Sequence, residues 1–593
     1  MQFSARMQQR SRCNKMRLGS RKKQWVIQPT DEHTVHLAKS LKVSPLLAQV
    51  LINRGITNAQ IGSDFLRPKL TNLISPEQMP GVKAATNRIK QAIRNKEKIT
   101  IYGDYDVDGI TGVAILWQIL TLLGGNVDYY IPHRIDEGYG LNEKAIHSLA
   151  KSGSKLLVTV DCGINAKKSA KIAKQLGMEL IITDHHQPDP ELPDAVAIVH
   201  PALEEDYPNH NSSGAMVAFK LAWAIANEFN SGRKLGSELR EFMINATTLA
   251  ALGTIADIMD IRGENRVLTS YGLKSLPDCK LCGIQALIES VGLTGKILNS
   301  SHIGFQCAPI LNAAGRMGHA RLAVELLTSN SRTHSNQIAE YLKQQNTQRQ
   351  RYERKIFKQA CEMVIQHGLD HADRKSFVLA GENWHIGVIG IVASRIVDKY
   401  YRPTIVINSS KAIAQGSARS IAGFDILKAI SHCSEHLVNF GGHKMAAGIT
   451  IETEKIAQFT ADLEAYTKQN LSKDDTVTKL HIDAASSLSK FQRATVNELQ
   501  MLGPFGQGNP KPIFATKGVR LSSPPRKVGA KGDHLQLVIT DNTASIRCIG
   551  FGFGEMEKKL LEYEFFNIAY QPEINTYNGN SNVQLVIADI QFE

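Results

Sequence analysis

The sequence predicts a multi-domain α/β protein that ends in a small β-barrel. Three observations lead to this fold class. Short apolar strands alternate with helical segments between residues 99 and 201, which is typical of a parallel sheet with helices on both faces. A second strand–helix–strand unit follows one long, highly charged helical segment at 334–368. From about residue 475 the chain changes to five short β patterns, which favour a barrel of the OB type.

The chain length sets the number of domains. At about 100–200 residues per domain, 593 residues, 42% of them hydrophobic, are enough for three or four cores. The expected segments are a basic N-terminal tail and lead-in at 1–75, a first α/β domain at 76–330, a connecting long helix at 331–372, a second α/β domain at 373–470, and an OB-like domain at 471–593.

The net charge of +13 is partly local. Residues 1–23 carry eight Lys or Arg and no acid, so the rest of the chain has a charge of +5. This mild excess is compatible with a nucleic-acid partner but carries little weight alone. The tail lacks the apolar centre of a secretory signal. A solvated basic tail or an upstream start codon, with Met16 as the true start, is favoured over a transit peptide.

The eight cysteines are scattered along the chain, which indicates a reducing compartment rather than a disulfide framework. Cys279 and Cys282 form a lone C-x-x-C without a well-spaced second ligand pair, so no structural zinc site is expected there. No apolar run approaches the roughly 20 residues that span a bilayer. We therefore expect no membrane association and a cytoplasmic location.

The first α/β region contains predicted strands that alternate with predicted helices. Predicted strands lie at 99–104, 127–134, 156–163, 180–186 and 196–201, and predicted helices lie at 110–124 and 165–177. Residues 246–260 predict a buried helix that stops at Asp257. In the second region, 376–407 reads as strand, loop, helix and strand, and the glycine-rich "NFGGHKMAAG" closes it.

Polar side chains follow the C-terminal ends of successive predicted strands. They are Asp104, Asp106 and Asp108, His133 and Arg134, Asp161, the run Asp184-His185-His186, and His200. In open α/β sheets the ligand crevice lies outside these strand ends. Five separate segments are therefore expected to project polar groups toward one edge of the sheet.

Three aspartates crowd into five residues of "GDYDVDG". A solvated acidic turn is the alternative, but these acids directly follow an apolar strand and precede a predicted buried helix. A buried unpaired carboxylate is costly, and a divalent cation reverses that cost. Asp161, His185, His186 and Asp257 come from other element ends and complete a cation site.

Carboxylates with one or two imidazoles and no thiolate suit Mn²⁺, or Mg²⁺ with more water. The carboxylates outnumber what one ion needs. Two cations about 3.5–4 Å apart, sharing one bridging carboxylate, would use them all. Such a pair lowers the pKa of a bound water and supports in-line displacement at phosphorus.

At this point the residues resemble a known family. The segments "GDYDVDG", "VDCG", "TDHH" and "GTIADIMD" resemble the signature motifs of the DHH phosphoesterases, and "GGHKMAAG" resembles their C-terminal DHHA1 domain. The segments "IPHRIDEGYGLNE", "LNAAGRMGHA", "WHIGVIGIVASR" and "GQGNPKPIF" narrow the resemblance to the RecJ exonucleases. It runs from about residue 75 to the C-terminus.

The resemblance implies a site for two Mn²⁺ or Mg²⁺ ions in the first α/β domain. The implied ligands are Asp106, Asp108, Asp161, His185 and Asp257, with Asp161 bridging. Asp104 and His186 are implied as close neighbours or further ligands. The implied catalytic residues are Asp161, His186 and His443. The family degrades single-stranded DNA from the 5′ end, in DNA recombination and repair, so we expect a 5′→3′ exodeoxyribonuclease.

Several polar residues gain candidate roles in gripping the 5′ phosphate and the strand. They are Arg134, Arg316, Ser417, Arg419, Ser420 and His443. Arginine forks bind phosphate bidentately and hydroxyl groups add donors. A surface arginine paired with an acid is the alternative for each arginine, and a simple turn residue is the alternative for His443. Without a G-x-x-x-x-G-K-[ST] loop, ATP hydrolysis is not expected.

The predicted barrel suits single-strand binding, since OB folds combine a basic groove with stacking aromatics. Candidates there are Lys527, Lys531, His534, Arg547, Phe551 and Phe553, although such aromatics are more often core residues. The expected partner is single-stranded DNA with a 5′ end, with a single-strand-binding protein or a helicase as further candidates, and the chain is expected to be a monomer. A DHH-type phosphodiesterase of short oligonucleotides or cyclic dinucleotides is the alternative; a non-catalytic scaffold would be expected to lack metal ligands.

Overall fold

The computed structural model describes residues 23–592, except residues 135, 231–235, 372, 473, 474, 476, 578 and 579. The predicted basic tail, up to residue 22, lies outside the described residues. The chain divides into two compact units. The first comprises residues 64–349 together with 503–510, and the second comprises the rest of the described chain.

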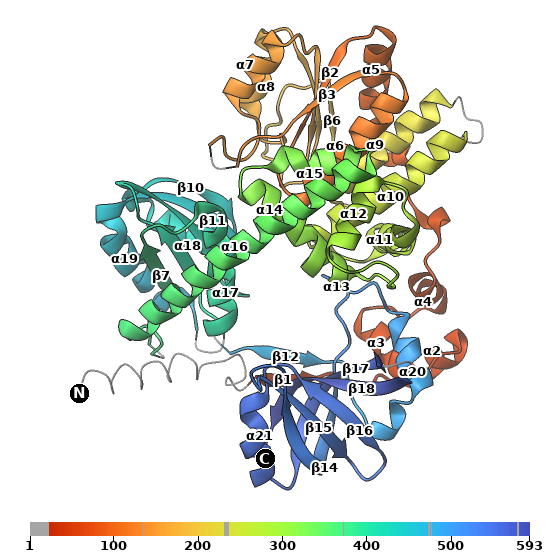
Figure 1. The fold of residues 1–593 in the computed structure, drawn as a ribbon, viewed down its shortest axis with the longest axis vertical. Coiled ribbons are helices and arrows are strands. Elements are labelled where there is room, and N and C mark those ends of the chain that lie inside the picture. Colours follow the sequence, from red (N-terminus) through yellow and green to blue (C-terminus); the bar gives the residue numbers. More distant parts are fainter. Residues whose placement is uncertain are drawn as a thin grey trace. The chain divides into compact units, whose positions relative to one another are not determined.

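The first unit is built on a five-stranded sheet in the order β3–β2–β4–β5–β6. Figure 1 labels β2, β3 and β6 of this sheet. All neighbouring strands pair in parallel, which confirms the predicted parallel sheet. The strands are β2 (Lys98–Gly103), β3 (Asn126–Tyr130), β4 (Leu156–Val160), β5 (Glu179–Thr183) and β6 (Ala197–Val199).

Helices cover both faces of this sheet, as the alternating pattern predicts. On one face Ile101 and Val158 pack in the main core with α5 (Val82–Arg94), α6 (Val107–Leu122) and α9 (Gly214–Phe229). On the other face Tyr102 and Leu157 pack with α7 (Glu143–Lys151) and α8 (Lys167–Gln175). Successive strand residues point to opposite faces, so the nearly continuous apolar strands serve two cores.

A helical region completes the first unit. It contains α10 (Ser237–Ala256), α11 (Gly263–Ser275), α12 (Cys282–Ser290), α13 (Ser300–His302), the π-helix η4 (Ile303–Cys307), α14 (Ala308–Arg316) and α15 (Ala320–Thr328). As predicted, α10 stops with Asp257 as its C-cap residue. At Gly253 a Cβ would lie 2.5 Å from Asp108 Oδ1 and from Ala215, so glycine is needed where α10 crosses the start of α6.

One helix of 35 residues, α16 (Arg332–Gln366), corresponds to the predicted connector. The α/β part of the second unit follows it, with a mixed sheet in the order β10–β11–β9–β8–β7. Only β7 and β8 pair in parallel. Its elements are β7 (Phe377–Gly381), α17 (Ile386–Tyr400), β8 (Thr404–Asn408), β9 (Ile413–Arg419), α18 (Ile426–His432), β10 (Leu437–His443), β11 (Ala446–Glu452) and α19 (Ile456–Asn470).

The C-terminal strands form the predicted barrel. Sheet order runs β14–β15–β16–β18–β17, and an additional β14–β17 pairing closes it. β16 and β18 are parallel, whereas the other barrel pairs are antiparallel. The elements are β14 (Phe514–Val528), β15 (His534–Thr540), β16 (Ser545–Gly550), α21 (Glu557–Glu562), β17 (Phe566–Tyr577) and β18 (Asn580–Gln591), with β13 (Ala484–Ala485) added beside β14.

The predicted lead-in contains a part that packs with these C-terminal elements. β1 (Gln24–Ile27) pairs in parallel with β12 (Lys479–Ile482). Beyond α2 (Thr34–Leu41), α3 (Pro45–Asn53) contacts the same region through Asn53 Nδ2, which donates to the Asp483 carbonyl at 2.8 Å. The connection from this part to the first unit runs through α4 (Ala59–Leu66). Nothing in the sequence pattern indicated this strand pairing.

Two of the composition-based expectations concern membranes and cysteines. In the described part of the chain, no single helix is long and apolar enough to cross a membrane, while α2 and α3 pass that test only as a pair bent by 113°. The seven described cysteines are free thiols. Cys279 Sγ contacts Asn245, Cys282 Sγ contacts the Asn330 carbonyl, and neither thiol belongs to a candidate metal cluster among the described residues.

Candidate metal centre and phosphate-binding residues

Two of the three crowded aspartates are fixed by helix starts. Asp106 is the N-cap residue of α6, and its Oδ1 accepts hydrogen bonds from the Asp108 and Gly109 amides at 2.9 and 3.2 Å. An aspartate is among the best N-caps because its carboxylate satisfies free amides of the first turn. Asp108 is 1% exposed and accepts from the first amides of α9, Gly214 and Ala215.

Asp104 and Asp161 are buried, and each has one carboxylate oxygen without a hydrogen-bond partner among the described residues. Among the described residues, Asp104 Oδ1 and Asp161 Oδ1 are buried and accept no hydrogen bond. Asp161 also has a φ of 63°, in the left-handed region that costs energy for most side chains and recurs at functional sites. A Cβ on Gly214 would come within 2.6 Å of the Asp161 carboxylate, so α9 can begin here only with glycine.

His185 lies at the centre of the cluster. Its Nε2 is 3.1 Å from Asp161 Oδ1, 3.6 Å from Asp257 Oδ2 and 3.8 Å from Asp108 Oδ2. These three carboxylates come from β4, the end of α10 and the start of α6. The segments that carry Asp108, Asp161, His185 and Asp257 therefore meet, as the sequence predicts.

His186 points to a different partner. Its Nδ1 is 2.7 Å from Asp184 Oδ1, and Tyr139 Oη lies 3.1 Å from the same ring nitrogen. Asp184 is fully buried and also accepts from the Ile164 amide. Tyr139 also donates to the Asp161 carbonyl at 3.2 Å. Sequence reasoning did not give Asp184 or Tyr139 a role, although Asp184 stands in the quoted "TDHH" motif.

Burial makes the carboxylates of this cluster hard to ionise. Desolvation, followed by the charge of Asp106, raises the pKa of Asp108 to about 7. Desolvation, followed by the charges of Asp108 and Asp106, raises the pKa of Asp257 to about 8 and that of Asp161 well above its usual range. Desolvation and then Asp106 raise the pKa of Asp104 as well. The protein alone therefore does not supply enough positive charge to stabilise the ionised form of these acids.

The two histidines shift in opposite directions. Burial, and then the charge of His186, lowers the pKa of His185 to about 4. For His186, burial acts to lower the pKa, but the hydrogen bond and charge of Asp184 outweigh it and raise the pKa to about 9. His185 is therefore a neutral imidazole, which is the form that binds metals.

The donor set fits divalent cations. Three overlapping groups have ligand atoms within 4.8 Å of one another: Asp104–Asp106–Asp161, Asp161–His185–His186 and Asp108–His185–Asp257. Two ligands of one ion at about 2.1 Å each lie roughly 3 Å apart, which is close to the 3.1 Å between Asp161 and His185. Asp161 belongs to two groups, and its buried Oδ1 lacks a hydrogen bond among the described residues, as a ligand of an ion would.

Two predicted arginines lie beside the same aspartate loop. The Arg134 guanidinium stacks over the Tyr105 ring at 4.8 Å. Arg316 ends α14, and a Cβ on its neighbour Gly315 would come within 2.5 Å of the Tyr105 carbonyl. His133 Nε2 would lie 2.3 Å from a Cβ on Gly318, so the two arginine-bearing segments dock on each other. Positive charge is thus gathered next to the cation cluster.

The other predicted substrate residues lie on the mixed sheet of the second unit. Arg419 and His443 both pair with Ala446 across β11, so they share one face of the sheet. Ser417 lies two residues before Arg419 and accepts from its guanidinium at 3.0 Å. Ser420 is buried, and its hydroxyl donates to the Phe424 carbonyl, so it contributes a turn contact rather than an open donor.

The face with Ser417, Arg419 and His443 is lined by small residues. Cβ atoms on Gly441 and Gly448 would meet nothing within 4 Å, and one on Gly390 of α17 would clash with Ser417 and Arg419. Glycines here leave open space in the middle of the face and allow α17 to approach its edge. Such a surface can accept an extended backbone.

On the barrel, His534 contacts Phe551, with ring centroids 5.3 Å apart, and Phe551 is 61% exposed. Lys531 and Arg547 are exposed, whereas Lys527 is paired with Glu557 at 3.4 Å. Phe553 is half-buried beside Gly550. Phe551 is therefore the one of the two candidate aromatics that offers a free ring face.

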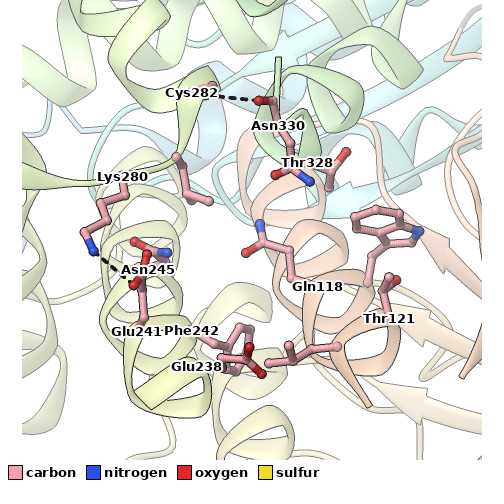
Figure 2. A pocket seen from close by; sticks show the side chains of 13 residues that line it. Gln118, Thr121, Glu238, Glu241, Phe242, Asn245, Lys280, Cys282, Thr328 and Asn330 are labelled. Atoms are coloured by element: carbon pink, nitrogen blue, oxygen red, sulfur yellow. Dashed lines mark hydrogen bonds and ion pairs between the residues drawn. The ribbon is translucent and has the colours of Figure 1, made fainter. Parts of the chain in front are cut away.

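A separate pocket of about 590 Å³ lies between the end of α6 and the start of α10 (Figure 2). Its lining contains none of the candidate ligands. Lys280 is held by Glu241 at 3.0 Å, and the lining also includes Glu238. With one paired lysine against two glutamates, this pocket does not suit a phosphate group.

The contact between Asp184 and His186 gives a first prediction. Changing Asp184 to asparagine should lower activity about 10–100-fold, the usual cost of losing a group that orients a metal-site residue. His186 would lose its charged partner, and its pKa should fall, which NMR titration of the cation-free protein can measure. Asp206→Asn, at an exposed position of the same unit, should change neither quantity. An unchanged His186 titration would contradict the assignment.

Comparison with known proteins follows the same domain order. Family models match the DHH family, N-terminal domain, at residues 98–254, the DHHA1 domain at 373–469 and the RecJ OB domain at 482–589. The RecJ single-stranded-DNA-specific exonuclease of Bacillus subtilis is 40% identical over 96% of this chain and 71% of its own length. The Haemophilus influenzae protein of that name is 33% identical over 94% of this chain and 98% of its own.

Solved structures agree with these matches. The crystal structure of RecJ from Thermus thermophilus with Mn²⁺ has a TM-score of 0.83, 28% identity, and coverage of 96% of this chain and 80% of that one. The same protein with Mg²⁺ has a TM-score of 0.77.

The parallel sheet with acidic and histidine ligands at its strand ends, followed by the mixed DHHA1 sheet, defines a protein of the DHH class. The barrel and the full-length similarity specify it further. The chain belongs to the RecJ family.

Proposed function

We propose that this chain is a 5′→3′ exonuclease that hydrolyses the phosphodiester bonds of single-stranded DNA with two divalent cations, Mn²⁺ or Mg²⁺. The observation that carries it is the buried cluster at the strand ends, in which Asp161 belongs to two overlapping ligand groups. The relatives named as single-stranded-DNA-specific exonucleases supply the substrate class, and the role in recombination and repair follows from the family. The 5′→3′ direction rests on the family resemblance.

In this proposal Asp106, Asp108, Asp161, His185 and Asp257 hold the cations, with Asp161 shared and Asp104 beside them. When bound, such a pair activates water and stabilises the charge that develops at phosphorus. The chain fixes this geometry through helix ends, since Asp106 caps α6 and Asp257 caps α10. His186, whose ring contacts Asp184, is our candidate for donating a proton or a hydrogen bond to the reacting phosphate.

The strand is gripped by cationic and hydroxyl groups. Arg134 and Arg316 flank Tyr105 beside the cluster, which supports a role in binding the terminal phosphate. Ser417, Arg419 and His443 share a glycine-lined face, which supports contacts with phosphates of the strand. Ser420 keeps only a supporting role through its turn. His443 remains our candidate for stabilising charge on the scissile phosphate.

The barrel favours a long strand over the alternative substrate class. A phosphodiesterase of short oligonucleotides or cyclic dinucleotides needs only the two α/β parts. Here the exposed Phe551, next to His534, offers a stacking surface of the kind that binds single strands without sequence preference. Single-strand-binding protein and helicases fit as partners because a single-stranded end has to be generated and kept open. We retain a monomer in the cytoplasm as part of the proposal.

The decisive experiment uses single strands labelled at either end, with and without each cation. Labelled mononucleotide should appear at once from the 5′-labelled strand, whereas the 3′-labelled strand should shorten progressively. EDTA should stop both reactions. Immediate release of the 3′ label, or hydrolysis of cyclic dinucleotides in preference to long strands, would overturn the proposal.

The arginine pair gives a second prediction. Arg316→Met should raise KM for 5′-phosphorylated strands about 10–100-fold, because a charge-assisted contact contributes roughly 1.5–3 kcal/mol. The loss should be much smaller for strands with a 5′-hydroxyl end, since the lost partner is then absent. Arg240→Met, at an exposed position of α10, serves as the control. Equal losses on both substrates would argue against terminal phosphate binding.

A further inference from the structure

The loop Gly503–Pro510, with the sequence GPFGQGNP, has no role in the function proposed above. In the chain it connects α20 (Arg493–Gln500) with β14, both of which belong to the second unit, yet the loop itself packs as part of the first unit. These eight residues therefore pack with a different unit from the residues on either side of them. Specific contacts account for this packing.

Buried polar contacts hold the first half of the loop. Arg266 of α11 is 2% exposed, and its guanidinium donates to the Gly503 carbonyl at 2.7 Å and to the Phe65 carbonyl at 2.7 Å. Ser300 Oγ donates to the Phe505 carbonyl. Buried charge-assisted hydrogen bonds of this kind fix the position of the backbone they hold.

The second half of the loop holds the turn after Asp257. The Ile261 amide donates to the Gln507 carbonyl at 2.8 Å, and Arg262 Nε donates to the Gly508 carbonyl at 2.6 Å. A Cβ on Gly508 would lie 2.9 Å from the Asp260 carboxyl group. The loop therefore grips residues 260–262, three to five residues after the candidate ligand.

The loop is stiff enough to act as a clamp. The Gly506 and Asn509 backbones bond each other in both directions, at 3.0 and 3.2 Å. Asn509 Nδ2 donates to the Pro504 carbonyl at 2.8 Å. These bonds close the loop on itself.

The gripped turn contains a strained residue directly after Asp257. Ile258 follows Asp257 directly and has a φ of 59°, which is a strained conformation for a β-branched residue. Its side chain is 69% exposed, so burial of that side chain does not hold it there. Strained residues persist only where the surroundings over-determine them. The end of α10 supplies one side of that support, because the Ile258 and Met259 amides donate to the Ile255 and Thr254 carbonyls at 3.3 and 3.2 Å. Residues 260–262, which the loop clamps, follow on the other side.

We propose that loop 503–510 is a positioning element of the cation site, which holds Asp257 in place by clamping the turn that follows it. This inference rests on the proposed function only in requiring that Asp257 binds a cation. The loop leads within four residues into β14, so it also links the barrel to the cation site along the chain.

The first test compares Gly508→Ala with Gly518→Ala. Both glycines have positive φ, 68° and 62°, but a Cβ on Gly518 would meet nothing within 4 Å, so the pair isolates the contacts with Asp260 and Arg262. Gly508→Ala should speed hydrogen exchange of the Ile261 amide and weaken Mn²⁺ binding about 10-fold, as loss of a group that orients a metal ligand does. Gly518→Ala should match the parent in both measurements.

A milder variant covers the case in which Gly508→Ala fails to fold. Arg262→Met removes one exposed donor to the loop, and Arg240→Met is its control. Arg262→Met should weaken Mn²⁺ binding several-fold. Parent-like Mn²⁺ affinity and Ile261 exchange in the clamp variants would overturn the proposal. Mn²⁺ binding is measured without DNA, so a parent protein that binds Mn²⁺ but does not degrade single strands would overturn the proposed function alone.

Discussion

Replacing Asp161 by asparagine is expected to abolish cation-dependent hydrolysis while leaving the cation-free protein at least as stable as the parent. In the parent, the buried Asp161 carboxyl has a strongly raised pKa, caused first by burial and then by Asp108 and Asp106. Removing its charge relieves that repulsion. Asparagine keeps the shape of the side chain and is among the residues that best tolerate the observed φ of 63°.

Loss of a residue that only orients a metal ligand lowers activity by up to roughly 100-fold. The loss for Asp161→Asn should be larger, because Asp161 belongs to two of the three overlapping ligand groups. Thermal unfolding with and without Mn²⁺ separates the two effects. Mn²⁺ should raise the Tm of the parent and of the exposed control Asp206→Asn, but not that of Asp161→Asn. A variant that keeps the parent's Mn²⁺-induced shift would remove Asp161 from the cation site.

The sequence was sufficient to predict the parallel sheet and the meeting of its polar strand ends. The reason is physical: parallel strands put their carboxyl ends at one edge, so residues that follow each strand converge whatever the intervening loops do. Asp104, Asp106, Asp161 and His185 were placed in this way. Asp257 was also predictable, because a buried helix pattern ends at it.

The different contacts of Asp184, His185 and His186 could not be predicted from the sequence, in which these three residues are consecutive. Once a strand ends, the alternation of side chains no longer fixes their directions. Asp184 turns inward to the Ile164 amide, His185 faces Asp161, and His186 faces Asp184. The residue pattern alone therefore did not separate the two histidines, and only the family resemblance favoured His185 as a ligand, whereas the structure gives them opposite pKa shifts.

Contacts between distant segments account for the other gaps. Tyr139 contacts His186, which lies 47 positions later in the sequence. β1 pairs with β12, and each of these strands has only four residues. Such short strands give too little periodicity to predict a partner. Residues 506–514 were noticed only as a family motif, since nothing local indicates that loop 503–510 packs away from α20 and β14, which flank it in the sequence.

Raising the pH from about 4 to about 8 is expected to destabilise the cation-free protein, and saturating Mn²⁺ should remove most of that loss. The folded state raises the pKa of Asp108 to about 7 and that of Asp257 to about 8, from an ordinary value of 3.8. It therefore keeps protons that the unfolded chain releases. Stability from these groups is present at low pH and is lost as the pH rises through 7–8.

The histidines modify this trend without reversing it. His186, with a pKa raised to about 9, also loses its contribution as the pH rises. His185, with a pKa lowered to about 4, acts in the opposite sense, because its stability is lost as the pH falls below its ordinary value of 6.5. A tenfold change in a proton-dissociation constant corresponds to about 1.4 kcal/mol, so Asp108 alone accounts for at most about 4 kcal/mol.

Cations compete with these protons, because carboxylates must be deprotonated to bind a metal. The rise in Tm produced by Mn²⁺ should therefore be small near pH 5 and large near pH 8, with protons released on binding that calorimetry in two buffers can count. Asp161→Asn should show little Mn²⁺-induced shift at any pH, and added KCl at equal ionic strength should not mimic Mn²⁺. A Tm shift that is the same at pH 5 and pH 8 would mean that Mn²⁺ binds elsewhere, since ligands with ordinary carboxylate pKa values are already ionised at pH 5.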